Sequence, residues 1–159
     1  MLEMKFRHFL HRAKRIKRLT QLIVLVSFLV TFGLVRAITH LQKAGYLPNQ
    51  TGDVHVHHLV PGIFLLLITG YIGLSFWHHA KLRQMMAVLY GVGAALVMDE
   101  FALWLYLHDV YWSEQGRDSI DAVIITTALM ILAFVVSEIY DIRSSRLKHL
   151  HDQENQEKE

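Results

Sequence analysis

Four long apolar runs in the 159-residue sequence limit what this chain can fold into. They occupy residues 19–35 (continuing to about 38), 59–77, 82–107 and 122–139. A helix needs about 20 apolar residues to cross the hydrocarbon core of a bilayer. An amphipathic surface helix would show a polar face at every turn, and these runs do not. The sequence therefore predicts an all-α polytopic membrane protein with four transmembrane helices.

The regions outside the runs complete the predicted organisation. We expect a basic leader at residues 1–18, a four-helix transmembrane domain at 19–141, and a polar tail at 142–159. The first run follows a basic leader, as a secretory signal peptide does. The leader and the run are both long, however, and Arg36 is a poor neighbour for a cleavage site. An uncleaved signal anchor is therefore the favoured interpretation.

Lysine and arginine lie mostly on one side of the predicted membrane domain. Seven are in the leader, two are in the loop between the second and third runs, and four are in the tail. The other side has Lys43 and Arg117, with Arg36 near the interface. The positive-inside rule then places both termini in the cytoplasm. We expect the protein in the inner (plasma) membrane. As a secondary effect, the basic leader is suited to contact anionic lipid head groups.

Composition excludes several classes of protein. The chain has no cysteine, which rules out disulfide scaffolds, thiolate zinc sites and iron–sulfur clusters. A net charge of +2 gives no indication of a nucleic-acid partner. The chain is 53% hydrophobic and 19% charged, which is the opposite of a disordered composition.

Two adjacent acids, Asp99 and Glu100, lie inside the third run. One carboxylate in a membrane helix costs on the order of 2.5–3.5 kcal/mol on insertion scales, less near the helix end. One interpretation is that both carboxylates reach up to the membrane–water interface. Adjacent residues lie about 100° apart on a helix, so we expect that they do not face the same neighbour. At least one should face the bundle interior, paired with Arg36, a histidine or a bound cation.

Three histidines, His55, His57 and His58, precede the second run. In helical backbone His55 and His58 share a face, and in extended backbone His55 and His57 do. Either geometry gives a two-histidine clip, and imidazole suits Zn, Fe, Cu or Ni. A carboxylate can complete three protein ligands with a position left open for water. The alternative is that these histidines hydrogen-bond lipid phosphates or carboxylates at the interface.

The loop before the fourth run supplies further candidate ligand-binding residues. They are Asp109, Arg117 and Asp121, and with Arg36 they fall on the outer side. Arg36 and Arg117 are suited to hold a phosphate or a carboxylate in two-pronged fashion. A structural interpretation is complete as well and is slightly favoured. In it Ser119 caps the fourth helix and Asp121 lies in its first turn, where negative charge is favoured.

Glycines indicate where the helices pack. Gly62, Gly70 and Gly73 lie in the second run, and Gly91 and Gly93 lie in the third. Small residues let helix backbones approach closely in lipid. We therefore expect the tightest contact between the second and third helices.

Three segments carry a resemblance to known proteins. They read HHLVPG at 57–62, DEFALW at 99–104 and DVYW at 109–112, followed by Asp-Ala at 121–122. In them the chain resembles a family of small bacterial integral membrane proteins of uncharacterised function. The resemblance covers about residues 36–125. It implies a membrane location and no activity.

These observations support three functional hypotheses. The first is a metal-dependent hydrolase acting on a lipid or lipid-linked substrate at the outer leaflet. In this hypothesis His55, His57 and His58 hold a divalent metal, zinc being favoured. Asp99 or Glu100 is a further ligand, and the other is the general base to a metal-bound water. Arg36 or Arg117 would hold an anionic head group.

The second hypothesis is a cation- or proton-binding or transport protein, within a homo-oligomer because four helices enclose little volume. The inner halves of the second and third helices are almost purely apolar, which argues against a continuous path. The third hypothesis is a structural subunit, in which the polar residues form internal salt bridges and the apolar helices contact partner membrane proteins. The sequence places the hydrolase slightly ahead of transport, and both ahead of structure alone.

Overall fold

The computed structural model describes residues 2–48, 57–76, 79–107 and 117–156, and every element in these residues is an α-helix. The helices are α1 (Leu2–Lys43), α2 (Leu59–Ser75), α3 (Ala80–Asp99), α4 (Phe101–Tyr106) and α5 (Arg117–Gln156). The prediction of an all-α protein is confirmed. At 1.5 Å per residue, α1 and α5 are about 60 Å long, roughly twice the thickness of a bilayer core.

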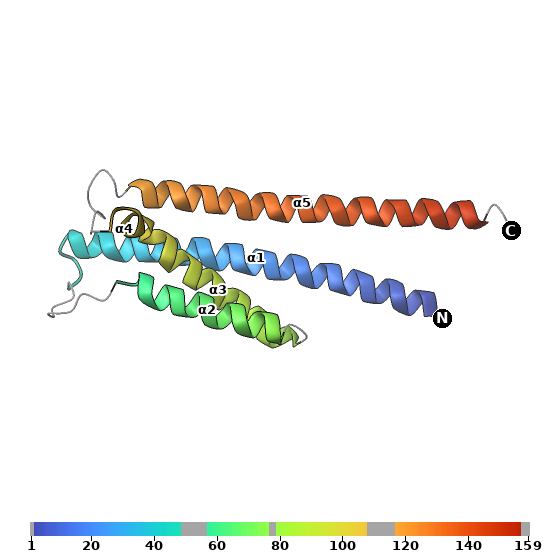
Figure 1. Cartoon of the computed structure of the whole chain (residues 1–159), viewed down its shortest axis with the longest axis horizontal. Coiled ribbons are helices and arrows are strands. Elements are labelled where there is room, and N and C mark those ends of the chain that lie inside the picture. The colour runs from blue at the N-terminus through green and yellow to red at the C-terminus, as the bar shows by residue number, and fades with distance from the viewer. Residues whose placement is uncertain (1, 49–56, 77–78, 108–116, 157–159) are drawn as a thin grey trace.

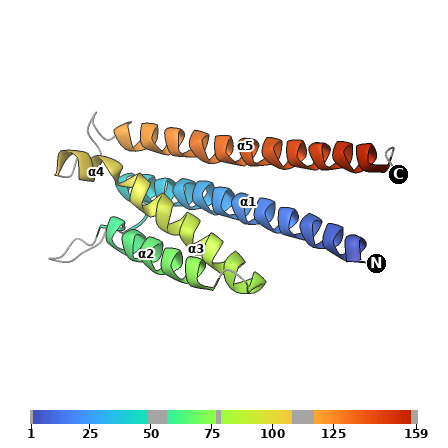
Figure 2. The same cartoon turned by 45° about the vertical axis from the view of Figure 1, so that its right-hand side comes forward.

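The helices run alternately in opposite directions. Helix α1 begins and α5 ends at the same end of the molecule, and α2 ends and α3 begins on the side of the bundle nearer to this end, short of both termini (Figure 1). We call this the terminal end. Helix α2 and α5 begin at the opposite end, which we call the far end (Figures 1 and 2). The arrangement is the one that four antiparallel segments with both termini on one side would adopt.

The helix boundaries differ from the sequence prediction in two ways. The run at 82–107 is divided, because Glu100 leaves helical geometry at φ −103° and ψ 24° between α3 and α4. The short α4 then ends at Leu107, whose φ of 55° is left-handed. The first and last helices are longer than their apolar runs and continue through the basic leader and into the polar tail.

Helix α3 is the centre of the bundle and packs against both α1 and α2. The core consists of Phe28 of α1, Ala94 and Ala95 of α3, and Val123 of α5. Partly buried Phe32, Leu66, Met98 and Met130 pack against it.

The second and third helices do meet closely at one pair of glycines, but the prediction that theirs is the tightest contact is wrong, because a Cβ on Gly91 of α3 would come closer still to α1, at 2.6 Å from the carbonyl oxygen of Val24. A Cβ on Gly62 would lie 3.0 Å from the carbonyl oxygen of Gly93, and a Cβ on Gly93 would lie 3.0 Å from that of Gly62. Gly70 and Gly73 take no part, since a Cβ on either would meet nothing within 4 Å. Gly91 faces α1 instead, so α3 has a second close contact that the glycine pattern did not assign.

Most of the apolar surface of the long helices is not covered by the protein itself. The segments Ala13–Lys43 and Arg117–Leu147 are long and apolar enough to cross a membrane, and α2 is a shorter apolar helix. Only 6% and 11% of the most apolar parts of the two long segments are buried. A core helix of a soluble protein would be mostly buried, so these two helices do not fit that role.

Candidate functional site

Five ionisable side chains converge at the far end of the bundle, and we call them the ionic cluster. Helix α1 contributes Arg36, and the start of α2 contributes His57 and His58. The junction of α3 and α4 contributes Asp99 and Glu100. The cluster joins three segments that are distant in sequence. Arg36 lies 21 positions before His57, and His58 lies 41 positions before Asp99.

Asp99 lies at the centre of the ionic cluster and is completely buried. Its Oδ1 is 2.5 Å from Nε of Arg36, and its Oδ2 is 2.9 Å from Nε2 of His58. Nη2 of Arg36 also donates a hydrogen bond to the carbonyl oxygen of Asp99 at 3.3 Å. The guanidinium carbon lies 5.4 Å from the centre of the Phe32 ring, within cation–π range. Charge, hydrogen bonding and packing thus hold Arg36 against α3.

Glu100 connects the helix break to the start of α2. Its Oε1 is 2.9 Å from Nδ1 of His57, and its Oε2 accepts the backbone N–H of Leu59 at 2.8 Å. The first N–H groups of a helix lack partners within the helix, and a negative charge at this end is favourable. Glu100 therefore caps α2 from another part of the chain, and His58, the N-cap residue, makes no side-chain cap of its own.

The expectation that Asp99 and Glu100 do not face the same neighbour is wrong. Both approach His58, Asp99 through Nε2 at 2.9 Å and Glu100 through Nδ1 at 3.6 Å. The 100° argument assumed a continuous helix, and α3 ends at Asp99. The non-helical backbone of Glu100 brings the two carboxylates to the same side.

The formal charges of the ionic cluster nearly balance. Two carboxylates and one guanidinium sum to −1, and two imidazoles lie beside them. Such balance matters because a buried charge is tolerated only when it is paired and hydrogen-bonded. His57 and His58 are the most exposed members, at 29% and 28% of their side-chain surface. The cluster is therefore closed towards α1 and α3 and partly open at the histidines.

The other candidate residues fall outside this cluster. His55 and Asp109 lie outside the described residues. Arg117 and Asp121 are exposed on the first turns of α5 and take no part in the ion pairs of the cluster. Ser119 takes a different role from the predicted cap of the fourth helix. Its buried hydroxyl accepts the backbone N–H of Ala102 at 3.0 Å and so caps α4.

A second set of polar contacts joins α1 to α5 near the terminal end. Arg18 pairs with Glu138 through two hydrogen bonds, and Lys17 lies 3.7 Å from Asp141. Lys14 donates to the carbonyl oxygen of Asp141 at 2.9 Å. From the sequence, these basic residues predict the orientation of the chain and a contact with anionic lipid, and not a pairing with the last helix. A signal was present, because Glu138 and Asp141 are acidic residues at the end of the last apolar run, opposite a basic leader.

Metal ligation and a polar path along α2 are the features that the hydrolase and transport hypotheses require of the described residues. Among them, no group of three or more His, Asp or Glu side chains is placed so that it could hold a metal ion. Among the few polar groups in the inner half of α2, Thr69 is satisfied within its own helix. Thr69, which is buried, donates to the carbonyl oxygen of Leu65 at 2.6 Å, and Tyr71 is 74% exposed on the outer surface.

Comparisons with protein-family models, with curated proteins and with solved structures find no match to this chain.

Proposed function

We propose that this chain is a bacterial inner-membrane protein that crosses the bilayer four times, with both termini in the cytoplasm. Four observations support the proposal. Two helices are long and apolar enough to span, their apolar surfaces are largely uncovered, and α1 begins at the same end at which α5 ends. That end has most of the lysine and arginine. The ionic cluster then faces the extracytoplasmic side.

Cysteine accessibility tests this topology, since the chain has no cysteine of its own. Single substitutions at three exposed positions are informative: Ala44→Cys after α1, His79→Cys before α3, and Gln153→Cys in the tail. In intact cells, a membrane-impermeant maleimide should label only Ala44→Cys. The other two should react only after permeabilisation. Labelling of His79→Cys in intact cells would show that α2 and α3 do not span, leaving two membrane segments.

We further propose that the protein is a structural subunit of a membrane assembly, whose ionic cluster fixes three helices at the outer surface. The pairing within the cluster carries this proposal: Asp99 is fully buried between Arg36 and His58, and Glu100 is bonded to His57 and to the start of α2. Groups committed to one another in this way hold helices together without a ligand. The uncovered apolar faces of α1 and α5 then contact partner helices, a second copy of this chain, or lipid.

A metal-dependent lipid hydrolase is the second candidate, and one observation favours it. Nδ1 of His57 and Nδ1 of His58 both approach Oε1 of Glu100, at 2.9 and 3.6 Å, while Asp99 holds the other nitrogen of His58. Metal-binding histidines are commonly oriented by a carboxylate on their second nitrogen. In this candidate Glu100 keeps its bond to Nδ1 of His57, a cation binds at Nε2 of the same ring, and His55 is a further ligand. In this second proposal the metal is zinc, and the substrate that is hydrolysed is a lipid or a lipid-linked molecule.

Metal analysis and copurification separate the two candidates. The protein would be purified in detergent without a chelator or a histidine tag, alongside His57→Ala/His58→Ala and Asp99→Asn/Glu100→Gln. We expect less than 0.1 metal ion per chain, variants that unfold more easily, and partner chains recovered after crosslinking in the membrane. One zinc per chain, lost in both double variants, together with a partner-free monomer would overturn the structural role in favour of the hydrolase.

A further inference from the structure

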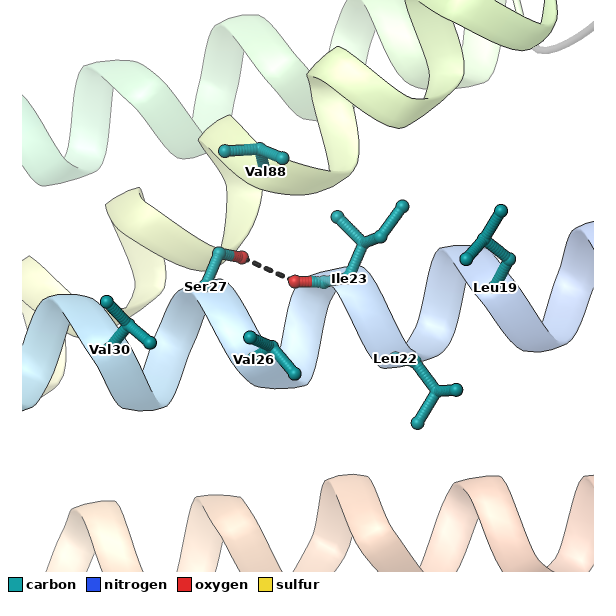
Figure 3. A pocket seen from close by; sticks show the side chains of 7 residues that line it. All are labelled: Leu19, Leu22, Ile23, Val26, Ser27, Val30 and Val88. Carbon is teal, nitrogen blue, oxygen red and sulfur yellow. Dashed lines mark hydrogen bonds between the residues drawn. The ribbon is translucent and has the colours of Figure 1, made fainter.

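A shallow, open apolar groove runs along an exposed face of α1, beside α3. It has a volume of about 490 Å³ and is lined by Leu19, Leu22, Ile23, Val26, Ser27 and Val30, with Val88 of α3 (Figure 3). The α1 residues recur every three or four positions, so they form one face of the helix. Ser27 is the single polar side chain in the lining, and its hydroxyl donates to the carbonyl oxygen of Ile23 at 2.7 Å. The groove therefore offers hydrocarbon contacts and little else.

The length of the groove matches one leaflet of a bilayer. From Leu19 to Val30 is 11 residues, or about 16 Å of helix. Half of a hydrocarbon core is about 15 Å thick. A transmembrane helix packed here would instead make contact over about 30 Å, the whole core. The groove thus fits a single acyl chain that enters from the terminal end.

A basic side chain continues the same face beyond the groove. Arg15 lies one turn before Leu19 on α1, and its side chain is exposed. The contacts to α5 at this level are made by Lys14, Lys17 and Arg18. On α3, Lys81 lies two turns before Val88 and is also exposed. A guanidinium at the mouth of a hydrocarbon groove is the arrangement that recognises a phosphate head group attached to a chain.

We infer that this groove binds one anionic phospholipid of the cytoplasmic leaflet, with an acyl chain along Leu19–Val30 and its phosphate at Arg15. The inference rests on the proposed membrane placement, which the cysteine experiment tests separately. It goes beyond a general attraction of the basic leader to the membrane surface, because it assigns one lipid to one groove and one arginine.

Native mass spectrometry of the full chain released from a non-ionic detergent tests the inference. Dioleoyl phosphatidylglycerol and dioleoyl phosphatidylcholine would be titrated in parallel, since they share acyl chains and differ in net charge. We expect one phosphatidylglycerol bound per chain. Arg15→Gln should weaken its binding about fivefold, the equivalent of ~1 kcal/mol for one basic residue at an anionic surface. Phosphatidylcholine binding should change less than twofold.

Two matched controls make the result specific. Val26→Trp fills the groove and should weaken both lipids, whereas Ile125→Trp, at an exposed apolar position on α5, should not. Arg143→Gln removes an equivalent exposed charge from α5 and should leave phosphatidylglycerol binding unchanged. Equal losses in Arg15→Gln and Arg143→Gln, or in the two tryptophan variants, would overturn the inference. A dimer mass that Val26→Trp abolishes would overturn it too, because a second copy would then occupy the groove.

Discussion

Replacing Arg36 with methionine should lower the free energy of unfolding by about 3–5 kcal/mol. The substitution removes the guanidinium from Asp99, whose carboxylate is completely buried, and leaves that charge without its cationic partner on α1. The same change removes the hydrogen bond to the carbonyl oxygen of Asp99 and the contact with the Phe32 ring. Equilibrium unfolding in mixed micelles, monitored by circular dichroism, measures the effect.

A second variant distinguishes a lost charge pair from a lost side chain. In Arg36→Met/Asp99→Asn both charges are gone, while the asparagine can still hydrogen-bond His58. Because the penalty of the single variant comes mainly from an uncompensated buried charge, the double variant should recover about 2 kcal/mol or more. Arg117→Met, at an exposed position on α5, should stay within about 0.5 kcal/mol of the wild type. If Arg36→Met costs no more than Arg117→Met, the ionic cluster does not hold the helices together.

The helices and the candidate partners of the buried acids could be predicted from the sequence. Long apolar runs place α1, α2, α3 and α5, because apolar length and the absence of polar turns are local properties of the chain. Asp99 had Arg36 and the histidines as its candidate partners. The structure confirms Arg36 and His58 in that role. This could be foreseen because a charge within an apolar helix requires compensation, and few ionisable groups lie at the corresponding ends of the other apolar runs.

The local geometry of the cluster could not be predicted, because it depends on tertiary contacts. Nothing in the letters DEFALW marks Glu100 as the point at which the helix breaks. The break is matched by bonds from Glu100 to residues 57 and 59, which lie more than 40 positions earlier. Ser119 similarly caps α4 and not its own helix, because α4 packs on α5. The bonding pattern of the site therefore had to come from the structure.

The close approach of α1 and α3 leads to the second large effect, at Gly91. A Cβ at this position would lie 2.1 Å from Oγ of Ser27 and 2.6 Å from the carbonyl oxygen of Val24. Both distances are far inside van der Waals contact, and the Val24 oxygen belongs to helical backbone that cannot turn aside. Gly91→Ala should therefore force α1 and α3 apart and cost about 3 kcal/mol, at the upper end of the range for overpacking.

Two comparisons make the Gly91 prediction sharp. Gly70→Ala adds the same methyl group where nothing lies within 4 Å. Its free energy of unfolding should be unchanged or higher by about 0.5–1 kcal/mol, since alanine is the better helix former. Ser27→Ala/Gly91→Ala removes the Oγ contact but keeps the clash with Val24, so it should recover only part of the loss. Complete recovery would mean that side-chain crowding alone sets the distance between the helices. Partial recovery would mean that the two backbones meet at Gly91, where α3 tolerates no side chain because its other face is already held against α2 at Gly93.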